Sequence, residues 1–403
     1  MSLSNITVLD LTHYFAGPYC TKLMAGFGAN VIKVERPGSG DKLRTLGPFF
    51  TENHSIENSI PFQWLNTGKK SITLDLRSEE GTQIIKKLVA QADVLIESFR
   101  PRTMPGFGLS YLTLQTINPR LIMTAISNFG QSGPYRDYEA EEIVEYALSG
   151  LMSVTGDPNA APLCSGPLMT QYTAGMHAYI ASLMALLQRD RTGQGQFIDV
   201  SIHESALGNI EISLAEFLHL GRVAKRSGDK HPLVPWQLYP CKDGHAAVIG
   251  GPVRHWLPAV PMFDEPRLFD EKYRHMSGRM QHREEVDDLL KPWLSKHRKR
   301  EIYYEGQRRH LAFGYLATLA EVEESPQLNS RGYFVDVEHP VSGKQKHCGP
   351  AFRMSAIDYK TIRAPLLGEH TEEILCGYLG YSRERLEALS HAGVISLPRV
   401  SKA

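Results

Sequence analysis

The fold is decided near the start of the chain, by residues 8–44, which read VLDLTHYFAGPYCTKLMAGFGANVIKVERPGSGDKLR. The apolar run Ile6–Leu11 predicts a buried strand, and a loop ending in Ala16-Gly17-Pro18 follows it. A helix to about Phe27 and a second strand, Asn30–Glu35, come next. Parallel strands joined by a helix are typical of α/β domains, so this stretch predicts such a domain.

The alternation of strands and helices continues along the chain. Ser71–Leu76, Asp93–Phe99 and Leu121–Ser127 predict further strands, and Ser78 is placed to cap a helix that runs to about Ala92. Strands that alternate with helices pack as a sheet with helices on both faces. The fold class expected is therefore α/β, with a doubly wound, mostly parallel, Rossmann-like sheet.

The pattern of apolar and charged residues changes after residue 220. A polar break at Lys225–Lys230 precedes a turn at Lys242-Asp243-Gly244 and charged helical segments such as Arg283–Leu294. We therefore expect a large α/β domain over residues 1–220 and a small α+β domain over residues 225–325. Residues 330–403 are expected to form a linker and to return to the large domain.

Composition excludes several classes of function. The 403 residues contain 44 Lys and Arg against 44 Asp and Glu, so neither nucleic acid nor an anionic membrane is expected as a partner. No apolar run reaches about 18 residues and no signal-peptide pattern is present, which predicts a soluble, cytoplasmic protein. The five cysteines lie far apart, which predicts reduced thiols and no metal site.

Two common catalytic patterns are absent. No G-x-G-x-x-G spans the turn at Gly17, and Gly26 and Gly28 lie at the wrong end of the predicted helix. No G-x-S-x-G is present either, and His13 has no Ser or Cys partner at a recognisable spacing. The sequence therefore disfavours classical NAD binding and a nucleophile elbow.

Residues 8–44 and three later blocks together resemble the family III CoA-transferases, whose superfamily includes α-methylacyl-CoA racemases and carnitine-type CoA-transferases. The later blocks occur in the same order as in the family: NTGKKSITLDL (residues 66–76), DVLIESF (residues 93–99) and RDRTGQGQFIDVS (residues 189–201). The resemblance is strong over residues 5–210. It implies a large α/β domain and a small domain joined by long linkers, with two subunits interlocked like chain links.

The resemblance also implies which residues contact CoA, the expected substrate. The backbone of Tyr14 should approach its pantetheine or adenine end, and the guanidinium of Arg36 should face the nucleotide, where it suits a phosphate or an adenine ring. The positions implied around the adenine and ribose are Leu74, Arg77, Ser98 and Phe99. Plain core packing explains Leu74 and Phe99 equally well, and a surface charge at a helix start explains Arg77.

Two cations of the family are missing from this chain. Gly106 stands where relatives have an arginine after the DVLIESF strand, and Glu139 stands where they have a lysine. Each loss removes about 1 kcal/mol or less of attraction for phosphate at a partly exposed site. Arg100 or Arg102 is expected to compensate.

The largest departure concerns the nucleophile. The sequence predicts an apolar helix from about Gly175 to Arg189, and the resemblance places an aspartate four residues before Gly175, where this chain has Gln171. In the family that carboxylate attacks the donor thioester and forms an acyl anhydride, whereas an amide is a poor nucleophile. Glu142 matches an acid on the wall of the site and is expected to be a hydrogen-bonding residue there rather than a new nucleophile. Racemases pair a histidine with the aspartate, but the matching positions here are Glu141 and Gln171.

Three hypotheses remain open. In the first, the chain is the non-nucleophilic subunit of a heteromeric CoA-transferase that moves CoA from a donor such as succinyl-CoA to a carboxylic acid. A paralogous subunit then carries the aspartate, as in the transferases that activate benzylsuccinate during toluene breakdown. The shortened glycine-rich segment Ile249–Pro252, which Pro252 would stiffen, fits a site without an anhydride to protect.

The second hypothesis is a CoA-thioester lyase, isomerase or hydrolase without an aspartyl intermediate. It requires a new base, for which Glu142 or His177 is a candidate, although His177 on an apolar helix reads as a packed core residue. The third hypothesis is a regulatory protein that binds acyl-CoA without turnover.

Overall fold

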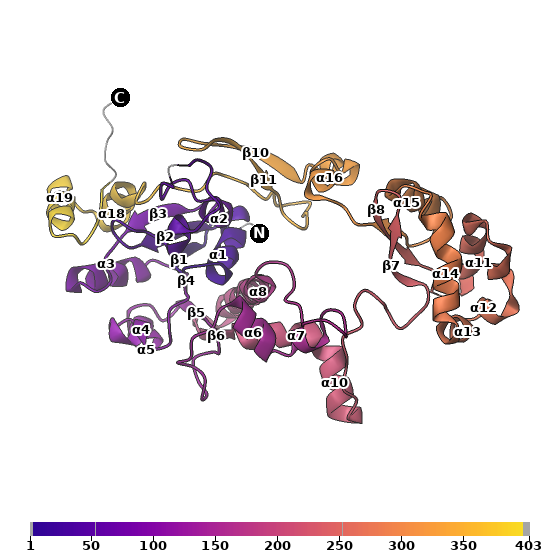
Figure 1. Ribbon diagram of the computed structural model, residues 1–403. Coiled ribbons are helices and arrows are strands. Elements are labelled where there is room, and N and C mark those ends of the chain that lie inside the picture. Colours follow the sequence, from indigo (N-terminus) through magenta and orange to yellow (C-terminus); the bar gives the residue numbers. More distant parts are fainter. Residues whose placement is uncertain (1–2, 53, 252, 398–403) are drawn as a thin grey trace. The chain divides into compact units, whose positions relative to one another are not determined.

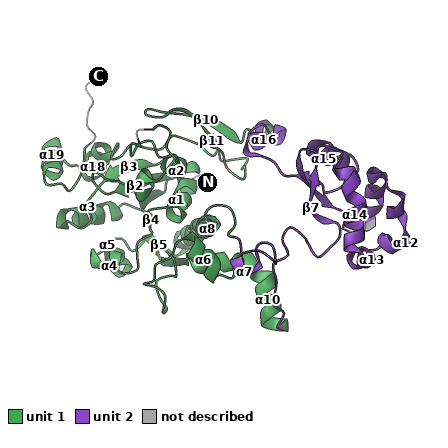
Figure 2. Cartoon of the chain, in the orientation of Figure 1, with its two compact units in different colours: residues 1–151, 164–220, 330–403 green, residues 152–163, 221–329 purple. Residues whose placement is uncertain are grey.

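The computed structural model describes residues 3–52, 54–251 and 253–397. The chain forms two compact units, shown in Figure 2: residues 1–151, 164–220 and 330–403 make the first, and residues 152–163 and 221–329 make the second. The domains expected from the sequence, 1–220, 225–325 and 330–403, differ from these units mainly in residues 152–163.

The first unit is built on a six-stranded parallel sheet with the strand order β3-β2-β1-β4-β5-β6 (Figure 1). Its strands are β1 (Thr7–Leu11), β2 (Asn30–Glu35), β3 (Lys70–Thr73), β4 (Val94–Glu97), β5 (Ile122–Ser127) and β6 (Phe197–Ser201). The order reverses between β1 and β4, so their connections leave in opposite directions and open a crevice at the carboxyl ends of the strands. The expected doubly wound sheet is confirmed.

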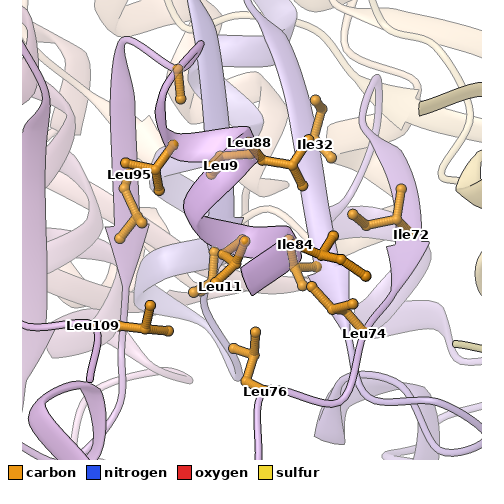
Figure 3. Packing of buried hydrophobic residues seen from close by; sticks show 14 of the residues in the cluster. Leu9, Leu11, Ile32, Ile72, Leu74, Leu76, Ile84, Leu88, Leu95 and Leu109 are labelled. Atoms are coloured by element: carbon orange, nitrogen blue, oxygen red, sulfur yellow. The ribbon is translucent and has the colours of Figure 1, made fainter. Parts of the chain in front are cut away.

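Successive residues of each strand serve opposite faces of the sheet. Leu9 of β1 and Ile32 of β2 pack against α3 (Glu79–Val89) in the core cluster of Figure 3, which also includes residues of α18 (Thr371–Leu379) and α19 (Arg383–His391). Val8 and Val31 belong to the cluster on the other face, which includes α1 (Ala16–Gly26) and α8 (Met169–Thr192). Both faces are therefore covered, which explains the nearly continuous apolar character of these strands.

Helix α8 begins earlier than the sequence indicates. The predicted start was about Gly175, but the helix begins at Met169, so Gln171 lies in its first turn. Gly175 has a different role, because a Cβ atom there would lie 2.5 Å from the carbonyl oxygen of Ala16. Glycine at this position therefore permits the close packing of α8 on α1.

The remaining elements of the first unit connect or extend this sheet. They are the 3-10 helices η1 (Lys42–Thr45) and η2 (Gly208–Ile210), the helices α2 (Ile60–Leu65), α4 (Thr103–Gly106), α5 (Tyr111–Ile117), α6 (Glu142–Leu148), α9 (Ile202–Leu207) and α10 (Glu211–Leu220), and the antiparallel pair β10 (Phe334–His339) and β11 (Gly343–Cys348). Helix α7 (Leu151–Val154) lies where the first unit passes into the second. Ser78 caps α3 as predicted, because its side chain accepts a hydrogen bond from the backbone of Gly81.

The second unit has a small antiparallel sheet with the order β7-β8-β9 and a core around Trp256. Its elements are β7 (Trp236–Cys241), β8 (Gly244–Ile249), β9 (Gly314–Tyr315), α11 (Val253–Ala259), η3 (Val260–Phe263), η4 (Pro266–Phe269), α12 (Glu271–Arg274), α13 (Met276–Gln281), α14 (Arg283–Leu294), α15 (Lys299–Arg308), α16 (Leu319–Glu323) and α17 (Pro326–Ser330). Gly250 and Gly251 follow β8, while Pro252 lies outside the described residues. No helix in the described part of the chain is long and apolar enough to cross a membrane.

A buried network of charges lies beneath the loops at the carboxyl ends of β1 and β2. Lys69 Nζ lies 2.9 Å from Asp10 Oδ2 and Lys33 Nζ lies 2.8 Å from Asp41 Oδ2, and all four side chains are shielded from solvent. Burial alone would raise the pKa of Asp10, but Lys33, Lys69 and two threonine hydroxyls lower that pKa to about 2. The network is therefore ionised at neutral pH and fixes both loops.

We predict that Lys33→Met lowers the free energy of unfolding by about 3–5 kcal/mol, because Asp41 and Asp10 are then left as buried charges without this partner. Lys70→Met is the matched control, since the ion pair of Lys70 with Glu373, at 2.6 Å, is largely exposed. This second substitution should cost less than about 1 kcal/mol. Equilibrium unfolding in urea measures both values, and equal losses would contradict a central role for the buried network.

Candidate active site

The loops that follow β1 and β4 are tied together at the crevice. The backbone N–H of His13 donates to Ser98 Oγ at 2.8 Å, and Ser98 Oγ donates to the carbonyl oxygen of His13 at 3.3 Å. The next residue, Tyr14, has a left-handed backbone with a φ of 70°. Its N–H points to Asp41 Oδ1 at 3.4 Å, so the buried charge network also anchors this loop.

An outer cavity of about 510 Å³ opens beside these loops, and five of the predicted CoA-binding residues line it: Arg36, Leu74, Arg77, Ser98 and Phe99. Arg36 and Arg77 are exposed, and Arg77 Nε donates to Asp75 Oδ1 at 3.0 Å. Leu74 also belongs to the core cluster of Figure 3, so core packing and cavity lining both apply to it. The structure thus brings these dispersed residues to one place.

An inner cavity of about 200 Å³ adjoins the outer one and contains Tyr14, Glu141 and Gln171 in its wall. Residues that line both cavities are His13, Lys42, Ser98, Phe99 and Arg100. We call the two cavities together the trough. Arg36 lines only its outer cavity, and Gln171 lines only its inner cavity.

The sequence offered Arg100 and Arg102 as equal alternatives for a compensating cation, and the structure distinguishes between them. Arg100 lines both cavities, while its Nη2 donates to Glu139 Oε1 at 2.6 Å. Arg102 is absent from the lining of both, and its Nη2 lies 2.7 Å from Asp137 Oδ2. Arg100, rather than Arg102, is therefore placed to meet a phosphate, together with Lys42.

Glu142 caps the N-terminus of α8 from a neighbouring helix. Leu168, the residue before α8, has a left-handed backbone conformation with a φ of 63° and supplies no side-chain cap. Glu142 accepts hydrogen bonds from the backbone N–H groups of Thr170 at 3.0 Å and Gln171 at 3.4 Å, and from the Thr170 hydroxyl. A carboxylate at this position satisfies free N–H groups and complements the helix dipole.

Glu145, one helical turn beyond Glu142, is the site residue that the sequence analysis missed. It is fully buried, and its Oε2 accepts a hydrogen bond from Gln171 Nε2 at 2.8 Å. Thr170 Oγ1 lies 3.2 Å from the same oxygen, while Glu145 Oε1 has no hydrogen-bond partner among the described residues. The only sequence signal was the spacing of two acids on one helix face, which does not reveal what that face contacts.

Burial raises the pKa of Glu145 to about 7, although the hydrogen bonds from Gln171 and Thr170 oppose the shift. The charges of Glu142 and Glu141 add to the increase. Glu145 therefore gains or loses a proton near neutral pH. Glu145 thus places an acid one side chain further from the cavity than Gln171.

The other candidate base, His177, lies on α8 but is exposed in this chain, so the prediction that it packs in the core is wrong.

All five cysteines carry free thiols. Among the described residues, no group of three His, Cys, Asp or Glu side chains is arranged to hold a metal ion.

Comparison with known proteins gives consistent matches over nearly the whole chain. The family model described as CoA-transferase family III matches residues 3–371. The human succinyl-CoA:glutarate CoA-transferase is 34% identical over 98% of this chain and 90% of that protein. The succinyl-CoA–D-citramalate CoA-transferase of Chloroflexus aurantiacus is also 34% identical, over 98% of each chain. A crystal structure of a CAIB/BAIF family protein from Brucella suis has a TM-score of 0.85 at 30% identity, covering 93% of this chain and 99% of that one.

We predict that Gly106→Arg strengthens CoA binding about two- to fivefold, because it adds a cation beside the outer cavity. Gly106 lies between the cavity residues Thr103 and Phe107, and a Cβ atom there meets no atom within 4 Å. Gly106→Gln is the uncharged control. Isothermal titration with CoA at low and high salt should show a gain for arginine alone that salt reduces. An equal gain in both variants would contradict an electrostatic cause.

Proposed function

This chain belongs to CoA-transferase family III, and from that premise we propose that it binds a CoA thioester along the trough and serves in the transfer of CoA to a carboxylic acid. The donor is a thioester such as succinyl-CoA, which appears in the names of two relatives. The nucleotide would lie in the outer cavity, near Arg36 and Arg77, and the thioester would lie near Gln171.

The observation that carries the finer proposal is the amide of Gln171 at the end of the trough. In the family reaction as the resemblance implies it, a carboxylate oxygen attacks the thioester carbon, the C–S bond breaks and CoA leaves as the thiolate. The neutral amide of Gln171 is a poor nucleophile for this step. We therefore propose that this chain is the non-nucleophilic subunit of a heteromer whose paralogous partner carries the aspartate.

Two helices of the first unit support the need for a partner subunit. Helix α8 exposes Met176, Ile180, Met184 and Leu187, which recur at helical spacing along one face. Helix α10 exposes Ile212, Phe217, Leu218 and Leu220. Apolar surface of this extent typically marks an interaction surface. A second subunit, interlocked with this one as the family resemblance implies, would cover both helices.

A second candidate function is favoured by Glu145. An acid that titrates near neutral pH, one side chain away from the cavity, is suited to general acid–base chemistry. A CoA-thioester hydrolase, isomerase or lyase would need such a group and no acyl anhydride. Turnover of a CoA thioester by the pure chain without any CoA acceptor would favour this candidate over transfer.

We predict that the pure chain transfers no CoA from succinyl-CoA to glutarate and acquires no covalent acyl group, because residue 171 is not a carboxylate. Chromatography of the CoA thioesters and mass spectrometry of the intact chain measure the two quantities. Co-expression with a paralogue that has the aspartate should restore transfer. An acyl adduct on this chain during turnover would overturn the proposal. Tight CoA binding without transfer activity, both for the pure chain and for the chain co-expressed with the paralogue, would indicate a regulatory protein.

We further predict that Gln171→Asp alone gives weak transfer activity, and that Gln171→Asp combined with Glu145→Gln gives at least about tenfold more. The new carboxylate would face Glu145, and two neighbouring acids raise the pKa of one of them, which leaves less nucleophilic anion. Replacing Glu145 by glutamine removes that repulsion. Glu145→Gln alone is the control and should remain inactive. Equal rates for the single Gln171→Asp variant and the double variant would show that Glu145 does not affect residue 171.

A further inference from the structure

We propose that Glu145 is a positioning residue which determines whether the nitrogen or the oxygen of the Gln171 amide faces the inner cavity. The inference deepens the proposed function, on which it rests, by assigning the chemical class of ligand group that the end of the trough accepts. Glu145 acts through Gln171, because Gln171 lines the cavity and Glu145 lies behind it.

Counting hydrogens shows that Glu145 favours a proton. Thr170 Oγ1 lies within hydrogen-bond distance of both Glu142 and Glu145 but carries one hydrogen. Glu142 already receives two backbone N–H groups at the N-terminus of α8, which stabilise its negative charge. Two facing carboxylates share one site most easily when one of them is protonated. Glu145, buried and with one oxygen unpartnered, is the better place for that proton.

The ionised state of Glu145 permits one orientation of the amide, and the protonated state also permits the opposite one. When Glu145 is ionised it only accepts hydrogen bonds, so Gln171 Nε2 faces it, as observed, and the amide oxygen is left for the cavity. When Glu145 is protonated, its O–H can donate to Gln171 Oε1, and the amide nitrogen turns to the cavity. The proton comes from solvent and returns to it.

The orientation of Gln171 changes which ligand groups the cavity end accepts. An amide oxygen repels a carboxylate or a thioester carbonyl oxygen, because all of these groups are hydrogen-bond acceptors. An amide nitrogen donates to either group. Protonation of Glu145 therefore favours the carboxylate of the acceptor acid or the thioester oxygen, and ionisation disfavours both.

The effect of Glu145 on a pH titration must be distinguished from the effects of other titratable groups near it. Glu141 and Glu142 belong to α6 or its cap, and Tyr14 from the loop after β1 interacts with both Glu141 and Glu145. Helix α9, which packs on α6, carries His203 and Glu204. The neighbours from α8, Thr170 and Gln171, do not titrate. Substitutions at these positions therefore identify which group responds to pH.

The first test needs no ligand. The full chain is labelled with nitrogen-15 at glutamine side chains, and the Gln171 signal is assigned by its loss in Gln171→Met. We expect this signal to shift with a midpoint near pH 7, the pKa of Glu145, and to lose that step in Glu145→Gln. A signal that does not change between pH 6 and 8, or one that changes equally in Glu145→Gln, would overturn the proposal.

The second test measures binding of glutarate to the CoA-saturated chain by isothermal titration. If the carboxylate binds only when Glu145 is protonated, its affinity falls about tenfold from pH 6 to pH 8, because the competent fraction falls by that factor. Glu145→Gln should abolish the difference, and His203→Asn should retain it. Loss of the difference in Glu141→Gln instead would assign it to Glu141 and overturn the proposal. Absence of CoA binding at either pH would refute the proposed function, while the nitrogen-15 titration would still decide the role of Glu145.

Discussion

The attraction between buried lysines and aspartates at the carboxyl ends of β1 and β2 is the constraint on which the site depends. Lys33 and Lys69 lie against Asp10 and Asp41 and, together with nearby hydrogen bonds, lower the pKa of each acid despite its burial. Asp41 also faces the backbone of Tyr14, and Glu35 binds Arg44 through two hydrogen bonds. Buried ion pairs thus anchor the loops that form the trough, and the outer surfaces of these loops remain available for a ligand.

The chemistry of the site reflects where its acids lie. Glu142 is engaged by the N-terminus of α8, and Glu145 is covered by Gln171. Neither of these two acids lines the inner cavity. The amide of Gln171 lines that cavity instead, and it can orient a ligand through hydrogen bonds.

Sequence patterns predicted local features well. The strand Asn30–Glu35 and the cap at Ser78 depend on neighbouring residues, and both occur as expected. The start of α8 was missed because its cap, Glu142, comes from another helix. Glu145 was missed for the same reason, since its partner lies 26 residues away in sequence. Arg102 could not be separated from Arg100 until their separate acidic partners were known.

The apolar residues exposed along α8 and α10 have a consequence for the life of this protein in the cell. Met184 and Leu187 of α8 are each more than 60% exposed, as are Ile212 and Leu218 of α10. Such surfaces adhere to one another when nothing covers them. A newly made chain whose α8 and α10 stay uncovered would therefore be prone to aggregation or degradation.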